Sequence, residues 1–247
     1  RNGNHLELTS SGEVFYEKAK KLLKHSTEMQ NEFLELGNRI PILKIGIPPM
    51  FSTIFFPEVI NAFELHHPDI QIELDEFGSV RACNLVQEEK LGLAIVNMEQ
   101  FNIDKFESRV LAKEQLVYVV SKNHPMSGKK YMTIEDFKDE KLVMFNVDSV
   151  QNELLKNRFD GLNISPHIIM RSSQLYTTLK FVDKGNCGCF LFSDMLPHFR
   201  EYVGIPLKPS IDVKIGIIWK KEKFLSHSAQ LFIDFAMQYC SEKIITP

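Results

Sequence analysis

From Ile42 onward, short apolar runs typical of β-strands alternate with longer stretches of helical periodicity. Strands are expected at residues 43–47, 70–74 and 93–96, with helices at 52–66 and 80–89 between them. A strand–helix–strand order of this kind predicts a mainly parallel sheet with helices on its faces. Ligands of such sheets bind beyond the carboxyl ends of the strands, so candidate binding residues should follow each strand directly.

The rest of the chain continues the alternation and ends with a returning strand. Further strands are expected at 115–121, 142–145, 167–170, 188–192 and 212–220, and further helices at 150–159, 173–184, 194–202 and 226–241. This order predicts an α/β fold of two lobes joined by two crossings. Residues 42–121 and 219–247 would form the first lobe, and residues 122–218 the second.

The N-terminal part predicts one long helix over residues 9–37. No proline interrupts it, and residues 10–13 have the pattern of a capping box. Seven positions, all apolar except Ser26, recur at alternating spacings of four and three: Phe15, Ala19, Leu22, Ser26, Met29, Phe33 and Leu36. This 3.5-residue repeat is typical of a coiled coil. We therefore expect the stripe to pack against a second copy, with packing inside the same chain as the alternative.

Composition excludes several classes of protein. With 29 Lys and Arg against 32 Asp and Glu, the net charge of -3 argues against a surface built throughout for nucleic acid, so any DNA contact must be local. No apolar run approaches the roughly 20 residues that span a bilayer, and the first residues lack a secretory signal pattern. Four widely spaced cysteines favour a reducing compartment, so we expect a cytoplasmic protein with no membrane partner. Since the sequence begins with Arg1, we expect it to be part of a longer chain.

Motifs of catalysis and metal binding are weak. The sequence has no Gly-rich phosphate loop, no His-Glu-x-x-His and no Gly-x-Ser-x-Gly. Cys187 and Cys189 have no second Cys or His pair near them, which favours buried thiols over a metal site. His66 and His67 are adjacent at a helix end and cannot both face one ion. We therefore expect no enzyme activity, no cofactor and no metal.

Candidate binding residues, several of them small and polar, follow three expected strands. They are Pro49, Met50, Phe51, Ser52 and Thr53 after the first strand, Ser79 after the second, and Asn97 and Met98 after the third. Free N–H groups at a helix start, together with hydroxyls, can hold an anion or a carbonyl group. Plain capping of the helix by Ser52 is the alternative, and it needs no ligand.

Several of these patterns occur in the order found in one family. Residues 8–16, Leu-Thr-Ser-Ser-Gly-Glu-Val-Phe-Tyr, resemble the end of the winged helix-turn-helix and the linker helix of LysR-type transcriptional regulators. Residues 43–47, Pro57, Phe63 and 68–70 are similar to the family's first strand, helix and second strand. Residues 77–79, 91–95 and 182–185 resemble its later strand and helix steps.

The resemblance implies a two-lobed effector domain of the periplasmic-binding-protein type 2 fold, behind a coiled-coil linker helix. Residues 1–8 would be the remnant of the DNA-binding wing. The recognition helix is absent from this sequence, so DNA would be bound through an N-terminal head of the complete protein. A homodimer through the linker helix, assembled further into a homotetramer, and a small-molecule effector between the lobes are also implied.

The expected effector contacts come from both lobes. To the first-lobe residues above, the second lobe adds Phe145, Asn146, Ser173 and Gln174. Ser52, Ser79, Asn97 and Gln174 would form hydrogen bonds, and Met50, Phe51 and Phe145 would form apolar walls. Alternatives are an extracytoplasmic solute-binding protein and an enzyme on the same scaffold. A redox-sensing regulator would require Cys187 or Cys189 to be exposed with a depressed thiol pKa.

Overall fold

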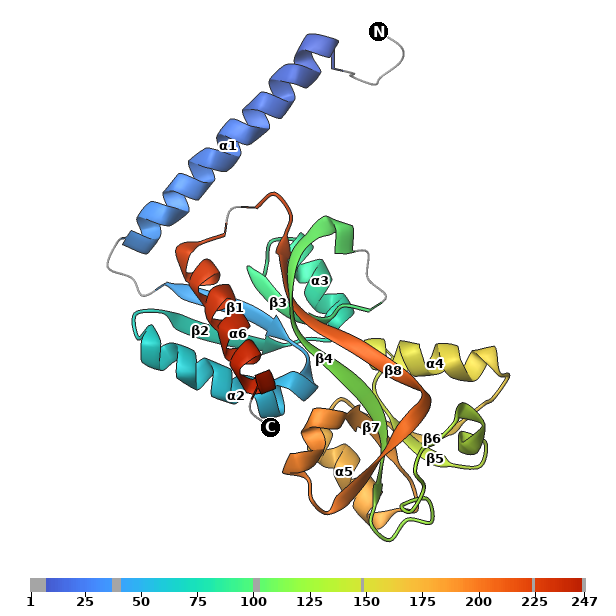
Figure 1. Cartoon of the computed structure of the whole chain (residues 1–247). Coiled ribbons are helices and arrows are strands. Elements are labelled where there is room, and N and C mark those ends of the chain that lie inside the picture. The colour runs from blue at the N-terminus through green and yellow to red at the C-terminus, as the bar shows by residue number, and fades with distance from the viewer. Residues whose placement is uncertain (1–7, 37–40, 100–102, 148, 224, 246–247) are drawn as a thin grey trace.

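A long helix stands beside a two-lobed α/β body (Figure 1). The computed structural model describes residues 8–36, 41–99, 103–147, 149–223 and 225–245. The predicted wing remnant lies outside this part of the chain except for Leu8, as do residues 37–40 of the linker. Helix α1 spans Ser10–Leu36, close to its predicted bounds. Among the described residues, no helix is both long and apolar enough to cross a membrane.

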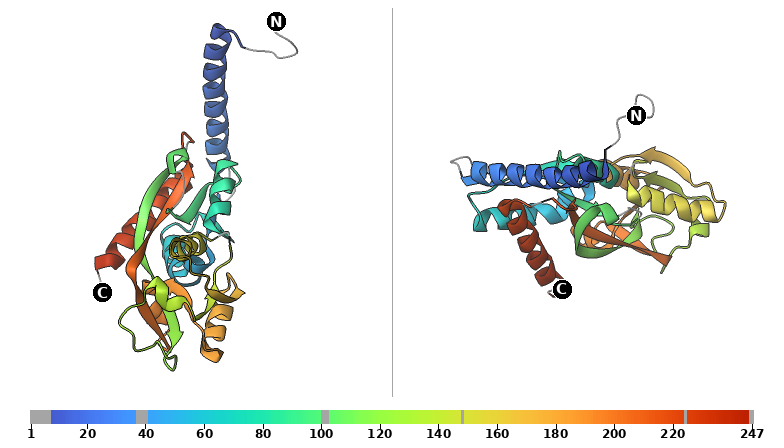
Figure 2. Two further views of the ribbon diagram at one scale, coloured as in Figure 1. Left: turned by 90° about the vertical axis from the view of Figure 1, so that its right-hand side faces the viewer. Right: turned by 90° about the horizontal axis from the view of Figure 1, so that it is seen from above.

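The apolar stripe of α1 faces solvent. Phe15 is 74% exposed, Leu22 72% and Phe33 67%. The helix stands clear of both lobes in Figure 1 and in the left panel of Figure 2. The alternative interpretation was that the stripe packs inside the same chain. In the structure these three side chains do not pack in that way. The side chain of Leu36 lies outside the described part.

The first lobe contains the parallel part of a six-stranded sheet. Its elements are β1 (Ile42–Ile47), α2 (Pro49–His66), β2 (Gln71–Glu76), α3 (Ser79–Gln87) and β3 (Leu93–Asn97). Strand β1 pairs in parallel with both β2 and β3, as the alternation predicts. The neighbour of β3 on its other side is β8, which runs antiparallel. The sheet is therefore mixed, in the order β2-β1-β3-β8-β4-β7.

Two long strands run through both lobes. They are β4 (Phe106–Ser121), preceded by the short 3-10 helix η1 (Ile103–Lys105), and β8 (Tyr202–Lys220). They pair antiparallel along most of their lengths, with a register shift between Leu116 and Val117. The sequence predicted only the ends of these strands, 115–121 and 212–220, because exposed polar residues interrupt their apolar pattern elsewhere. The division into lobes stays a prediction. It assigned residues 215–218 to the second lobe, whereas their pairing with β3 places them beside the first-lobe strands.

The second lobe has a smaller parallel pair of strands beside the long ones. Its elements are η2 (Ile134–Phe137), β5 (Lys141–Met144), α4 (Val150–Gly161), β6 (His167–Arg171), α5 (Leu175–Lys184), β7 (Cys189–Phe192) and η3 (Ser193–His198). The helix predicted over 194–202 is wrong. A 3-10 segment ends at His198 and β8 begins at Tyr202, since Pro197 lacks the N–H that a continuing α-helix needs.

The last helix returns to the first lobe. Helix α6 (His227–Ile245) packs against α2 of this lobe (Figure 1). Phe63 of α2 meets Phe232 and Phe235 of α6 edge-on, with ring centroids 5.2 and 5.4 Å apart. Such edge-to-face contacts add to the burial of the rings. The C-terminal helix thus completes the core of the lobe to which α1 is attached.

Candidate functional site

A cavity of about 220 Å³ lies between residues of the two lobes. The first-lobe side of its wall comes from the segments that follow β1 and β2, and the second-lobe side from those that follow β5 and β6. Its lining residues are Pro48, Pro49, Met50, Glu76, Phe77, Gly78, Ser79, Arg81, Phe145, Asn146, Ser149, Gln151 and Ser173. The strand ends therefore meet at one cavity, as expected for this class of sheet.

Three helices begin at this cavity. The first turns of α2, α3 and α4 supply Met50, Ser79 and Gln151 to the wall. The first N–H groups of a helix have no partner within the helix and form its positive end. Neither α2 nor α3 has a side-chain cap bond, whereas Ser149 Oγ caps α4 by accepting from Asn152 N at 3.1 Å. The convergence of three such ends favours an anionic or strongly electron-rich ligand.

Two charged side chains stand on the first-lobe wall. The guanidinium of Arg81 lies over the Phe77 ring, 4.9 Å from its centroid, an arrangement that fixes its position. Glu76 accepts a hydrogen bond from the Ser52 hydroxyl. Their formal charges cancel, so the helix ends determine the sign of the local potential. A carboxylate ligand would meet both these ends and Arg81.

Six of the twelve predicted effector contacts line this cavity: Pro49, Met50, Ser79, Phe145, Asn146 and Ser173. Ser79 is 4% exposed, and its Oγ accepts from Asn97 N at 3.1 Å. The hydroxyl hydrogen of Ser79 is left to point elsewhere, because Oγ acts as the acceptor in this bond. Asn97 therefore positions Ser79 from behind. All twelve stay predictions as effector contacts.

The other predicted contacts do not line this cavity. Helix α2 begins three residues earlier than predicted, so the Thr53 hydroxyl donates to Pro49 O at 2.9 Å. Ser52 Oγ also lies 2.8 Å from Pro49 O, and its single hydrogen is donated either to that carbonyl or to Glu76. Phe51 instead stacks on Phe192, with centroids 5.1 Å apart. The remaining residues outside the lining are Asn97, Met98 and Gln174. The exposed side chain of Gln174 accepts from the Thr177 hydroxyl at 2.9 Å.

Comparison with known proteins decides the family. Residues 39–241 match the model of the LysR substrate-binding domain. The chain belongs to this LysR family. It is 28% identical over 201 residues to the uncharacterized HTH-type transcriptional regulator YwbI of Bacillus subtilis (strain 168). This match covers 80% of this chain and 66% of YwbI. It is 24% identical over 250 residues to the transcriptional dual regulator GltC of the same organism, and this match covers 98% of this chain and 82% of GltC.

Solved structures agree on the fold. The effector-binding domain of QuiR, determined in complex with shikimate, has a TM-score of 0.71 and 22% identity, covering 83% of this chain and 99% of that one. The predicted family, regulator class and two-lobed fold are thus confirmed. These LysR relatives are transcriptional regulators rather than enzymes, and this favours a regulator over a solute-binding protein or an enzyme.

Sequence reasoning missed several lining residues of the LysR domain. Glu76 and Arg81 lie within five residues of Ser79, but the second strand was predicted to end at 74 and ends at Glu76. Had the strand end been placed correctly, the expectation that ligands lie just after strands would have included residues 76–81. Ser149 and Gln151 could have been found from the predicted helix start at 150, since both lie in its first turn.

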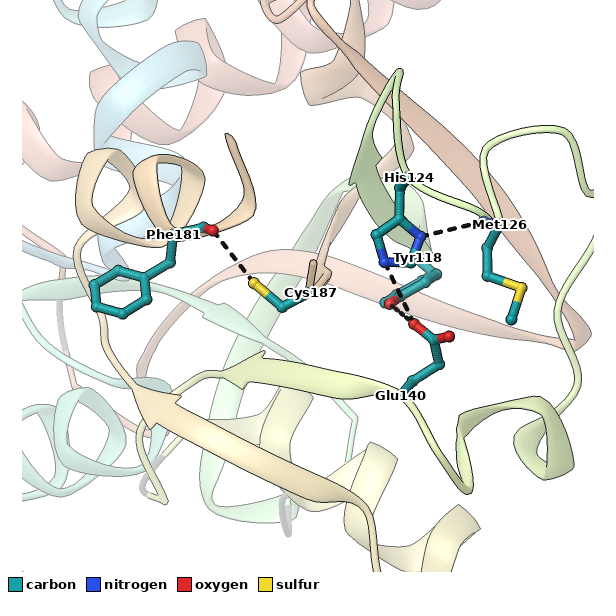
Figure 3. A network of polar contacts seen from close by, with 6 residues as sticks. All are labelled: Tyr118, His124, Met126, Glu140, Phe181 and Cys187. Atoms are coloured by element: carbon teal, nitrogen blue, oxygen red, sulfur yellow. Dashed lines mark hydrogen bonds and ion pairs between the residues drawn. The ribbon is translucent and has the colours of Figure 1, made fainter. Parts of the chain in front are cut away.

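A separate polar cluster lies in the second lobe (Figure 3). Tyr118 donates its hydroxyl to Glu140 Oε2 at 2.8 Å, and His124 Nε2 lies 3.6 Å from the same oxygen. His124 Nδ1 accepts from Met126 N at 3.2 Å. Burial lowers the pKa of His124 and raises that of Tyr118, so both side chains are neutral near pH 7. The cluster holds the loop after β4 in place.

A redox-sensing LysR regulator is not supported. Cys187 and Cys189 are buried, and burial raises the pKa of both thiols. Cys187 Sγ donates to Phe181 O at 3.3 Å (Figure 3). The redox alternative required an exposed thiol with a lowered pKa, and neither Cys187 nor Cys189 meets this requirement. In the part of the chain that the structure describes, no group of three or more His, Cys, Asp or Glu residues could hold a metal ion.

Proposed function

We propose that this chain senses a small anionic metabolite between its two lobes and passes the signal to a DNA-binding head. The observation that supports it best is the meeting of three helix N-termini and Arg81 at one cavity. These groups would bind a carboxylate through backbone N–H groups and a guanidinium. The complete protein would then act as a DNA-binding transcriptional regulator in the cytoplasm.

The cavity also limits the rest of the effector. A volume of about 220 Å³ lies below the range of pockets for drug-sized molecules, so the ligand would be a compact metabolite. Ser79, Asn146 and Ser173 offer hydrogen bonds to hydroxyl or carbonyl groups, while Met50 and Phe145 offer apolar contacts. A small hydroxylated carboxylate meets these requirements. Shikimate, which the QuiR domain binds, is a compound of this class and a suitable first probe.

An effector here would act on the arrangement of the lobes. Its contacts come from both lobes, so it would stabilise the arrangement in which both sets of contacts form at once. The change would reach α1 through β1, which follows it in the chain. Two copies paired through the exposed stripe of α1 would then move their DNA-binding heads, and further pairing of the lobes would give a tetramer.

We infer binding rather than catalysis at this cavity. No His or Cys is among the described residues that line it, so neither a serine–histidine nor a cysteine–histidine pair is assembled there. The function of the cavity would then lie in recognition alone. The effector would be released unchanged.

The test is calorimetric titration of this chain with shikimate and a panel of other small hydroxylated carboxylates, beside thermal unfolding. A carboxylate at about 100 times its Kd should add about 2.7 kcal/mol to the free energy of unfolding. Arg81→Gln should weaken it by about tenfold or more, since a charge-assisted hydrogen bond is lost. Arg109→Gln is the matched control, because Arg109 also lies over an aromatic ring, that of Trp219, but outside the cavity.

Three results would contradict the proposal. One is a panel in which no carboxylate raises the unfolding temperature. Another is a bound carboxylate whose affinity is the same in the Arg81→Gln variant and in the unaltered chain, and also in Ser79→Ala. Loss of affinity in the Arg109→Gln control would show that the ligand lies elsewhere.

A further inference from the structure

A second cavity of about 270 Å³ lies on the other side of Met50 from the first. Met50 lines both cavities and is 5% exposed. The wall comes from α2, β4, β8 and α6 on the first-lobe side, and from the end of β7 and η3 on the second-lobe side. The cavity thus lies at the level where the long strands pass from one lobe to the other.

Aromatic rings form much of this wall. Phe51 and Phe192 are stacked with centroids 5.1 Å apart and an interplanar angle of 18°. They come from different lobes, and both are buried. Phe56, which is fully buried, is the third ring of the lining. Faces and edges of such rings offer favourable contacts to an apolar body and to a cation beside it.

Two carboxyl groups interrupt the apolar wall. Glu114 is supplied by β4 and Asp194 by η3, so each lobe contributes one. Glu114 Oε2 is buried and has no hydrogen-bond partner among the described residues. Burial, with the nearby charge of Asp194, raises the pKa of Glu114 to about 8. Asp194 is exposed, as are the other acidic and basic groups of the wall, Glu58 and His198.

We propose that this second cavity binds a small organic cation, a primary ammonium group on an aromatic or branched apolar body. The ammonium would lie between Glu114 and Asp194, and would give the buried Glu114 oxygen the hydrogen-bond donor that it lacks. The body would contact the rings of Phe51, Phe56 and Phe192. A neutral or anionic molecule of the same shape leaves that oxygen without a charged donor and binds more weakly.

Binding of the cation exchanges one positive charge for another. Without ligand near pH 7, Glu114 holds a proton beside the ionised Asp194. When the ammonium enters, Glu114 releases this proton to solvent and both carboxylates pair with the ligand. The net charge of the site is then unchanged, because one positive charge enters with the ligand and one leaves with the proton. Proton release on binding is therefore a specific signature of this site.

This inference does not depend on the anion proposed for the first cavity, since the two probes have opposite charges. The first lobe supplies Phe51, Phe56 and Glu114, and the second lobe supplies Phe192 and Asp194, so an occupant stabilises one arrangement of the lobes. The shared wall at Met50 then couples the two cavities.

Calorimetric titration of this chain with benzylamine, benzyl alcohol and benzoate near pH 7 tests the proposal. The three probes have one shape and differ in charge. Benzylamine should bind at least about tenfold more tightly than the other two, with release of up to about one proton, measured by comparing buffers of different ionisation enthalpy. Glu114→Gln should weaken benzylamine by about tenfold and abolish the proton release.

Two further variants locate the bound probe. Ala112→Leu places a larger side chain in the cavity wall and should block benzylamine. Glu107→Gln is the matched control, because Glu107 is an exposed carboxylate on the same strand and does not line the cavity. Circular dichroism and thermal unfolding confirm that each variant is folded. Failure of benzylamine to bind, equal binding of the three probes, or unchanged binding in both Glu114→Gln and Ala112→Leu would overturn the proposal.

Discussion

At the residue scale, burial fixes protonation states that the sequence does not reveal. Glu114 and His124 are surrounded in the sequence by ordinary polar residues, and neither was singled out. In the structure the carboxyl group of Glu114 lies beside Asp194, and the imidazole of His124 lies beside Glu140. Both contacts join residues brought together by long strands and loops. The sequence could predict which strand ends meet, but not which titratable side chains become buried partners.

His124 should make the free energy of unfolding fall at acid pH. Burial lowers its pKa below the usual histidine value of about 6.5, so the unfolded chain binds more protons than the folded one. The stability due to neutral His124 is complete above that value and is lost as pH falls below it. In His124→Asn, an amide oxygen can still accept from Met126 N, and the fall between about pH 6.5 and pH 5 should become smaller.

Urea unfolding at several pH values measures this difference. His167→Asn is the control, because His167 is exposed at the start of β6 and its replacement should leave the pH dependence unchanged. A His124→Asn variant with the same acid fall as the unaltered chain would show that another group is responsible.

At the element scale, periodicity predicted most helices and strands, and it did so best where one face is buried. Helix α4 was predicted from residue 150, and it begins at Val150 behind its Ser149 cap. The errors lie where tertiary pairing overrides local pattern, as in β8, whose exposed residues 208–210 have no partner in β4 yet join the two paired stretches of one strand. The start of α2 was predicted at Ser52, whereas the helix begins at Pro49, since proline fits the first helical position.

The exposed stripe of α1 should hold two copies of the chain together. Leu22→Asp places a charge in the centre of the apolar stripe and should shift the dimer toward monomer, because desolvating an unpaired carboxylate costs several kcal/mol. Lys21→Asp introduces the same residue one position away, outside the 3.5-residue repeat, and should leave the dimer intact. Sedimentation velocity over a range of concentrations distinguishes the two. Equal dissociation of both variants, or of neither, would contradict dimerisation through this stripe.

At the scale of the whole molecule, the sequence predicted the two-lobed fold, and six of the twelve predicted effector contacts line the first cavity. It did so because parallel strand ends converge at one edge, a property of topology that the order of elements already contains. It could not place Arg81 over Phe77 or bring Gln151 next to Met50, since these contacts depend on the final approach of the lobes. The proposed anion site therefore depends most on the convergence of three helix ends.

Sulfate titration followed by NMR amide shifts tests this convergence without knowledge of the effector. Labelled chain would be titrated with sodium sulfate, against sodium chloride at equal ionic strength, so that screening is the same in both. We predict that sulfate shifts the amides of Met50, Ser79 and Gln151 most, because these N–H groups lie in the first turns that face the cavity. Shifts confined to exposed lysines on other surfaces, with these three amides unmoved, would contradict an anion site between the lobes.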